Sequence, residues 1–139
     1  MNAKEELLLR KLGENLNDSM VEICSLKSTG QRERQSYGLI SLKGAGFVMV
    51  SVKVTRTTQV ALTAEEVSFH LRMTEMGCPS FILVQTHPRG TKKTSLASLR
   101  LYVGSQVEDL YYRGTGVAGI DEWPLEAVQW RMLRWKLVE

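Results

Sequence analysis

The run from residue 46 to residue 86 constrains the fold of this chain more than any other stretch. An apolar segment rich in β-branched residues, GFVMVSVKV (46–54), comes first. The letters LTAEE follow, in which Thr63 is a good N-cap and Glu66 completes a capping box. A second apolar segment, SFILVQT (80–86), ends the run. A strand, a helix and a strand in succession predict a βαβ crossover with two parallel strands.

Before this run the chain shows one helix and one strand. Leucines at helical spacing predict a helix over residues 3–16. The polar stretch 24–36 contains a glycine and predicts a loop. YGLISL (37–42) is typical of a strand, and a short KGA turn joins it to the next strand as a hairpin.

After the run, SLRLYV (98–103) predicts a further strand, and a short helix is expected to end near Tyr112. Asp121 is expected to cap a last amphipathic helix that contains the three tryptophans. The predicted order is therefore α-β-β-α-β-β-α-α. It describes a single α/β domain over residues 1–139, with a mixed central sheet of about four strands flanked by helices.

Charge is unevenly distributed along the chain. Residues 34–107 carry nine lysines or arginines and three acids, an excess of six positive charges, although the whole chain has a net charge of +3. Such an excess attracts phosphate, and a chance imbalance on a solvated surface is the alternative interpretation. The apolar run Leu7-Leu8-Leu9 is too short for a membrane span or a signal peptide. We therefore expect a cytoplasmic protein with no membrane partner.

The ordered combination of these segments resembles the small PD-(D/E)XK nucleases of phages, including VRR-NUC and Holliday-junction-resolvase-like proteins. In that family a strand ends in E-x-K, a helix opens with L-T-x-x-Q, and A/G-G precedes a strand of the I-x-V-L-V kind. The corresponding stretches here are GFVMVSVKV and LTAEEVSFHLRMTEMGCPSFILVQ. The likeness covers roughly residues 20–103 and is strongest over 46–86. It implies a restriction-endonuclease-like fold.

The same resemblance implies that the catalytic carboxylates are missing. In the family, an Asp of the first hairpin and the Glu of E-x-K bind Mg²⁺, and the Lys steadies the nucleophile or the phosphate. Lys53 matches the lysine, but Ser51 stands in the place of the Glu. Residues 36–38, where the Asp is expected, contain no acid, and Glu66 stands in the place of the Gln. We therefore expect no catalytic residue, no metal site and no cofactor.

An alternative is that other acids rebuild the site. Glu22, which resembles a helix-borne acid of some relatives, and Glu33 are the candidates to join Lys53. The chain would then be a Mg²⁺-dependent DNA endonuclease or resolvase. Otherwise Glu22 and Glu33 are exposed charges and Lys53 is a strand-end lysine that reaches solvent. His70 is expected at the surface or at its boundary.

Basic and aromatic residues supply the expected binding sites. Nucleic acid is the leading expected partner, contacted through a basic set: Lys53, Arg56, Arg89, Lys92 and Lys93. A phage or host protein is the alternative partner, bound through a mixture of tryptophan and arginine: Trp123, Trp130, Arg131, Arg134 and Trp135. Core packing of these tryptophans and a homodimer are further alternatives.

Together these residues predict a catalytically degenerate nuclease-fold protein of phage origin that binds nucleic acid without cutting it. One alternative is a phage protein-interaction module, which inhibits a host enzyme or belongs to the virion. The other is a DNA endonuclease with a rearranged acidic site. The expected location is the cytoplasm of the host cell, with the virion as the alternative.

Overall fold

The computed structural model describes residues 1–26, 35–87 and 97–138. The strands of these residues form one six-stranded mixed sheet in the order β1-β2-β3-β4-β5-β6. They are β1 (Ser19–Leu26), β2 (Gln35–Leu42), β3 (Gly46–Thr55), β4 (Ser80–Thr86), β5 (Ser98–Val103) and β6 (Asp121–Pro124). The helices are α1 (Ala3–Asn15), α2 (Ala64–Glu75), α3 (Val107–Arg113) and α4 (Trp130–Val138), with short 3₁₀ turns η2 (Gly104–Gln106), η3 (Gly114–Gly116) and η4 (Leu125–Ala127). None of these described helices is long and apolar enough to cross a membrane.

The predicted βαβ crossover is confirmed. β3 and β4 are parallel, and α2 connects them, whereas every other pair of neighbouring strands is antiparallel. The predicted capping box also forms at the start of α2. Thr63 Oγ1 accepts the Glu66 N–H at 3.1 Å, and Glu66 Oε1 accepts the Thr63 N–H at 3.2 Å.

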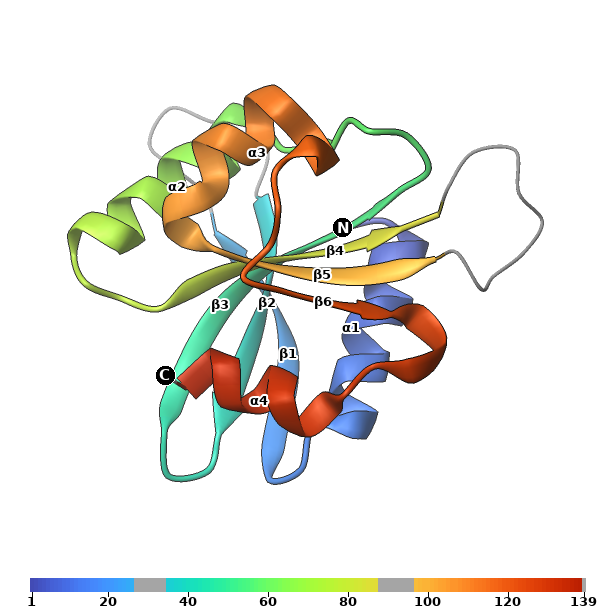
Figure 1. Ribbon diagram of the computed structural model, residues 1–139. Coiled ribbons are helices and arrows are strands. Elements are labelled where there is room, and N and C mark those ends of the chain that lie inside the picture. The colour runs from blue at the N-terminus through green and yellow to red at the C-terminus, as the bar shows by residue number, and fades with distance from the viewer. Residues whose placement is uncertain (27–34, 88–96, 139) are drawn as a thin grey trace.

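The sheet lies between two layers of helices, with α2 and α3 on one face and α1 and α4 on the other (Figure 1). Alternate residues of β3 explain this arrangement, because successive side chains of a strand point to opposite faces. Val48, Val50 and Val52 are buried in the larger apolar cluster, together with leucines of α1 and α4. Ser51 and Lys53 point the other way and meet α2.

Two predicted segments are wrong, so that the order of helices and strands is α-β-β-β-α-β-β-α-β-α and the sheet has six strands instead of about four. The first is the loop over 24–36, because β1 runs to Leu26 and β2 begins at Gln35. β1 is an edge strand with mostly exposed side chains, so its sequence lacks a clean apolar alternation.

The second wrong segment is the helix start at Asp121. This residue begins β6, and the last helix begins nine residues later, at Trp130. The Asp121 side chain accepts a local hydrogen bond from the Glu122 N–H at 2.9 Å. An Asp side chain makes this kind of bond in a turn or at a strand end as well as at a helix start. The presence of Asp121 alone therefore did not locate the helix.

Gly114 lets the loop after β3 approach the end of α3. Its φ is +59°, and a Cβ atom at this position would overlap the carbonyl oxygen of Thr58. The next residue, Thr115, donates its N–H to that same oxygen at 2.7 Å. The contact therefore requires a residue without a side chain.

Gly114→Ala is expected to lower the free energy of unfolding by roughly 1–3 kcal/mol, because the added carbon forces the two backbones apart. Gly116→Ala is the matched control, since a Cβ atom there meets no other atom within 4 Å. Urea denaturation of both variants measures the difference. Equal stabilities would contradict the close approach.

Candidate functional site

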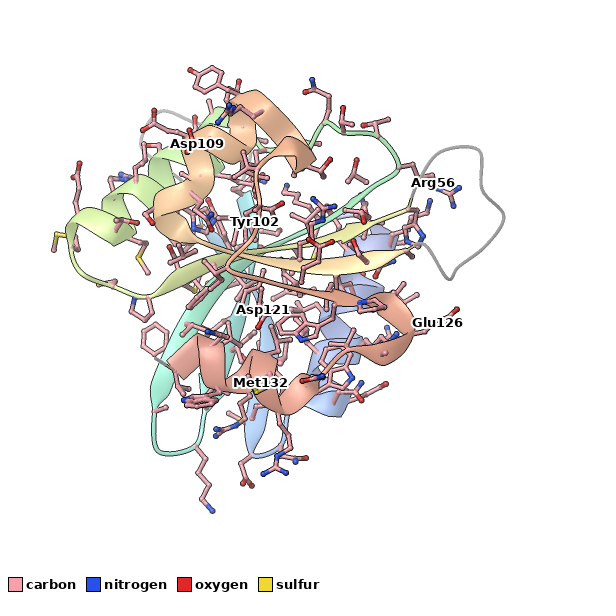
Figure 2. All side chains as sticks on the ribbon, viewed as in Figure 1. Arg56, Tyr102, Asp109, Asp121, Glu126 and Met132 are labelled. Carbon is pink, nitrogen blue, oxygen red and sulfur yellow. The ribbon has the colours of Figure 1, made fainter. Side chains whose placement is uncertain are left out.

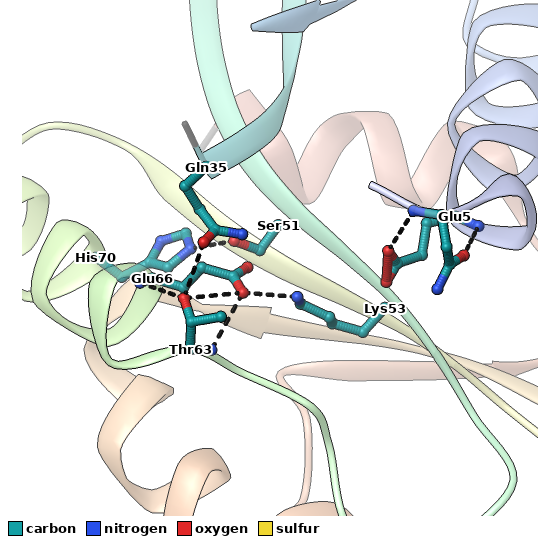
Figure 3. Close-up of polar contacts among 8 residues, drawn as sticks. Glu5, Gln35, Ser51, Lys53, Thr63, Glu66 and His70 are labelled. Atoms are coloured by element: carbon teal, nitrogen blue, oxygen red, sulfur yellow. Dashed lines mark hydrogen bonds and ion pairs between the residues drawn. The ribbon is translucent and has the colours of Figure 1, made fainter. Parts of the chain in front are cut away.

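A buried polar cluster lies between β3 and α2 (Figure 3). It consists of Ser51, Lys53, Glu66 and His70, which we call the polar cluster. Residues two apart on a strand share a face, and residues four apart on a helix lie one above the other. Ser51 and Lys53 therefore point from the strand into the space between the strand and the helix. Glu66 and His70 point into the same space from the helix.

Lys53 and Glu66 form an ion pair in this cluster. Lys53 Nζ lies 2.6 Å from Glu66 Oε1, and the two side chains are 11% and 1% exposed. The same oxygen accepts the N–H and the hydroxyl of Thr63, at 3.2 and 3.4 Å. One carboxylate oxygen thus binds the lysine and closes the first turn of α2.

Ser51 and His70 form the second polar pair. Ser51 Oγ lies 2.7 Å from His70 Nε2, and both residues are fully buried. His70 Nδ1 finds no hydrogen-bond partner in the described part of the chain. Burial, followed by the positive charge of Lys53, lowers the pKa of His70 to about 4. His70 is therefore neutral near pH 7. Because it is fully buried, the expected position at the surface or at its boundary is wrong.

Tyr37 occupies the segment where the nuclease resemblance expects an Asp. Its ring packs against Phe69, with centroids 4.3 Å apart, and lies 6.2 Å from the ring of His70. Burial, followed by the negative charges of Glu66 and Glu65, raises the pKa of Tyr37 above its usual value. An aromatic ring, rather than a carboxylate, thus packs beside the cluster at this position.

These residues do not fit a Mg²⁺ ion. Magnesium prefers several hard oxygen ligands at near-ideal octahedral geometry. The polar cluster offers one carboxylate, and that group is already bound to Lys53. The Ser51 hydroxyl is bound to His70. Across residues 1–26, 35–87 and 97–138, no three His, Cys, Asp or Glu side chains gather closely enough to hold a metal.

The acids proposed to rebuild the site lie elsewhere or outside the described residues. Glu22 sits on β1, not on a helix as expected, and is exposed. It lies opposite Leu39 of β2, so that a whole strand separates it from β3 and Lys53. Glu33 lies outside the described residues.

A second feature is a group of basic side chains around the carboxyl ends of β3 and β4, which we call the basic strip: Lys4, Lys11, Arg56, His87 and Arg100. Two hollows lie here, of about 300 Å³ beside α1 and about 420 Å³ beside η3. Arg56 and His87 line both hollows, so the strip is continuous. None of the described residues that line them is an acid.

The members of the basic strip differ in their charge. Arg56 is exposed and extends from the edge of the molecule, where β4 ends (Figure 2). Arg100 is partly neutralised, since its Nε lies 3.4 Å from Glu122 Oε1. Burial, followed by the charges of Arg56 and Lys4, lowers the pKa of His87. Lys4, Lys11 and Arg56 therefore provide most of the positive charge.

The expected nucleic-acid residues divide three ways. Arg56 belongs to the basic strip, whereas Lys53 is 11% exposed and bound to Glu66. Lys53 is therefore a strand-end lysine that does not reach solvent freely. The other three expected residues lie outside the described part of the chain: Arg89, Lys92 and Lys93.

The predicted partner surface is only partly assembled. Trp123 belongs to the core, in line with the packing alternative, and is 5% exposed. The other four residues of the set line a hollow of about 1000 Å³ along α4: Trp130, Arg131, Arg134 and Trp135. Arg134 donates its Nε–H to the Asn17 carbonyl at 3.0 Å, which ties α4 to the turn after α1. Trp135 is 57% exposed.

The residues that sequence reasoning missed are His70 and Tyr37. His70 follows Glu66 by four positions, so the predicted helix already placed the two side chains on one face. This spacing, together with the match of Glu66 to the Gln of the nuclease motif, could have predicted that His70 lies beside Glu66. Tyr37 lies in the segment where the resemblance expects an Asp, but no pattern in the sequence indicated that its ring would pack against the cluster.

The comparisons with known proteins give no match, whether with family models, with curated proteins or with solved structures.

Lys53→Met is expected to lower the free energy of unfolding by about 3–5 kcal/mol, because Glu66 would stay buried without its counter-charge. The double variant Lys53→Met, Glu66→Gln should recover much of this loss, since an amide oxygen can still accept the Thr63 N–H. Urea denaturation of the three proteins provides the comparison. A double variant no more stable than the single one would show that the ion pair is not the cause.

The pKa of His70 makes stability fall on acidification. It is about 4 in the folded chain, against about 6.5 in the unfolded one, so the unfolded state binds more protons between these values. The contribution is complete above pH 6.5 and is lost as the pH falls toward 4, by up to about 3 kcal/mol. Denaturation from neutral pH down to about 4 measures it. His70→Gln should lack this part of the slope, and an unchanged slope would contradict the assignment.

Proposed function

We propose that this protein is a catalytically degenerate, restriction-endonuclease-like protein of phage origin that binds the phosphate backbone of nucleic acid without cutting it. Two independent features support the proposal. One is the state of the polar cluster, and the other is the position and charge of the basic strip.

The single observation that carries the proposal is that the residues matched to the nuclease motifs lie together in one cluster. Ser51, Lys53 and Glu66, matched to the nuclease motifs from sequence alone, lie in one cluster between β3 and α2. Tyr37, from the expected Asp segment, packs against the same cluster. The positions therefore converge as a nuclease centre would require, but their polar groups bond to one another.

The internal bonding accounts for the loss of cutting. Lys53, which would hold a phosphate or a nucleophile in an active relative, is bound to a carboxylate and almost buried. The charge of this group is already balanced by Glu66 and its side chain is only 11% exposed, so it reaches a substrate phosphate only by leaving a 2.6 Å ion pair. Near neutral pH the ring of His70 is neutral, so it carries a single N–H and has no additional acidic proton to donate.

The basic strip accounts for binding. The hollow of about 420 Å³ is lined by cationic or neutral polar groups such as Thr57, Thr58 and Thr115. The hollow of about 300 Å³ adds Lys4 and Lys11 beside apolar side chains such as Leu7 and Val54. Lysine, arginine and threonine contact phosphate oxygens without reading base identity. We therefore expect binding that depends strongly on salt and weakly on sequence.

Fluorescence anisotropy of a labelled DNA duplex and a four-way junction, without metal and across a salt series, tests this function. The logarithm of the affinity should fall with that of salt by roughly 0.9 per neutralised phosphate. Arg56→Ala should weaken binding and reduce the slope by about one contact. Arg131→Ala is the matched control, because it removes the same charge from an exposed position on α4 and should leave binding unchanged.

Two outcomes would overturn the proposal. Absence of binding at low salt would favour the protein-interaction alternative, in which Trp135 is the most exposed aromatic residue of the α4 hollow. Cleavage with Mg²⁺ or Mn²⁺ that Glu22→Gln reduces would show an active, rearranged nuclease. Glu22 suits this test because it is exposed, so its replacement does not disturb the core.

A further inference from the structure

Among the described residues, β1 has a neighbouring strand on one side only and lies at one end of the sheet. With eight residues it is twice as long as β6, the strand at the opposite end of the described sheet. Its sequence, SMVEICSL, contains no proline and no lysine, the residues that commonly prevent edges from pairing. β1 therefore lacks two of the usual barriers to pairing with another strand.

The register identifies which backbone groups point outward. The Lys43 N–H donates to the Asp18 carbonyl at 2.9 Å, and these two residues continue the register in which Ser19 faces Leu42. In an antiparallel pair, residues that exchange such bonds alternate with residues that do not. Even-numbered residues of β1 thus bond to β2, and the N–H and C=O groups of Val21 and Ile23 point away from the sheet.

Three apolar side chains of β1 are exposed beside this edge. Met20 is 65% exposed, Ile23 is 49% exposed and Leu26 is 39% exposed. Met20 and Leu26 lie on one face of the strand and Ile23 on the other, because the side-chain period of a strand is two. Met20 and Leu26 each lie three residues from Ile23, so the three side chains are arranged symmetrically about Ile23.

We propose that two copies of this chain associate through antiparallel pairing of their β1 strands, with the two-fold axis at Ile23. Ile23 then faces Ile23 of the second copy, and Met20 faces Leu26 of the second copy on both sides of the axis. The backbone N–H and C=O of Ile23 point away from the sheet, as a hydrogen-bonded pair at the axis requires. The inference is independent of nucleic-acid binding.

Charge and side-chain matching favour this register over its neighbours. Here Glu22 lies opposite Cys24 of the second copy. A shift by one pair in one direction brings the two Glu22 side chains face to face, and a shift in the other direction brings the two Cys24 side chains together. Both shifts also separate Met20 from Leu26. The apolar contacts are complete only with Ile23 at the axis.

A hollow that carries charged side chains borders the edge. A hollow of about 460 Å³ runs between α1 and β1 and is lined by Val21 and Ile23 together with charges of both signs from α1: Glu6, Arg10 and Glu14. A two-fold axis places the same surface on both partners. Glu22 of β1 also lines the hollow, so that three acids and one base border the edge. The exposed apolar side chains, rather than these charges, therefore point to a second copy as the partner.

The oligomeric state tests the proposal directly. Light scattering coupled to size-exclusion chromatography should show a dimer whose fraction rises with concentration. Ile23→Lys should make the chain monomeric with an unchanged circular dichroism spectrum, because two like charges would meet at the axis. Phe47→Lys, an equivalent change at a 60% exposed apolar residue of the β2–β3 hairpin, should remain dimeric. A wild-type monomer at all concentrations, or a dimeric Ile23→Lys variant, would overturn the proposal.

Cross-linking tests the register. In a background of Cys24→Ser and Cys78→Ser, Ile23→Cys should form a covalent dimer on mild oxidation. The expected Cα separation of about 5.5 Å in a hydrogen-bonded pair lies within the range for a disulfide. Met20→Cys in the same background should not cross-link, because it faces Leu26 of the second copy. The reverse result would overturn the proposed pairing.

Discussion

The ion pair between Lys53 and Glu66 connects the central strand of this fold to the helix that crosses over it. A carboxylate that is 1% exposed is stable only if a counter-charge and hydrogen bonds replace its water. Lys53 supplies the charge from β3, and Thr63 supplies hydrogen bonds from the start of α2. Because one oxygen makes all these bonds, the position of the helix start relative to the strand is fixed. His70, one turn further along, is then directed at Ser51.

Under the proposed function, this arrangement separates two tasks that a metal-dependent nuclease combines at one place. The polar cluster keeps its charges neutralised among its own members, so it offers little attraction to a phosphate group. A group of positive charges open to solvent lies at the carboxyl ends of β3 and β4, around Arg56. Lys53 belongs to the first region and Arg56 to the second, although they are only three residues apart in the chain.

The parts of the fold that the sequence predicts are those set by local patterns. The capping box of α2 and the alternating β3 strand are such patterns, and both are confirmed. β6 is different, because its four residues are held by pairing with β5, where Trp123 lies opposite Leu99. A strand this short has no pattern of its own, and the N-cap signal of Asp121 pointed to a helix instead. Long-range packing decided the outcome.

The candidate site was likewise predicted in part. Ser51, Lys53 and Glu66 were identified from spacing and resemblance, because the chain order of the motifs is local information. Their mutual bonding was not predicted, since it depends on the distance at which α2 crosses the sheet. The same holds for the membership of the basic strip, in which Lys4 and Arg100 come from distant parts of the chain. The charge excess over 34–107 indicated phosphate binding but not its location.

Amide chemical shifts of the isotopically labelled protein, titrated with a short DNA duplex in metal-free buffer, test the central claim most directly. If nucleic acid binds at the basic strip and the polar cluster is a closed structural unit, the amides of Arg56, Thr58 and Thr115 shift on binding. Those of Ser51 and His70 then stay where they are. Shifts centred on Ser51, Lys53 and His70, with the residues around Arg56 unchanged, would place the nucleic acid at the nuclease-like centre and contradict this account.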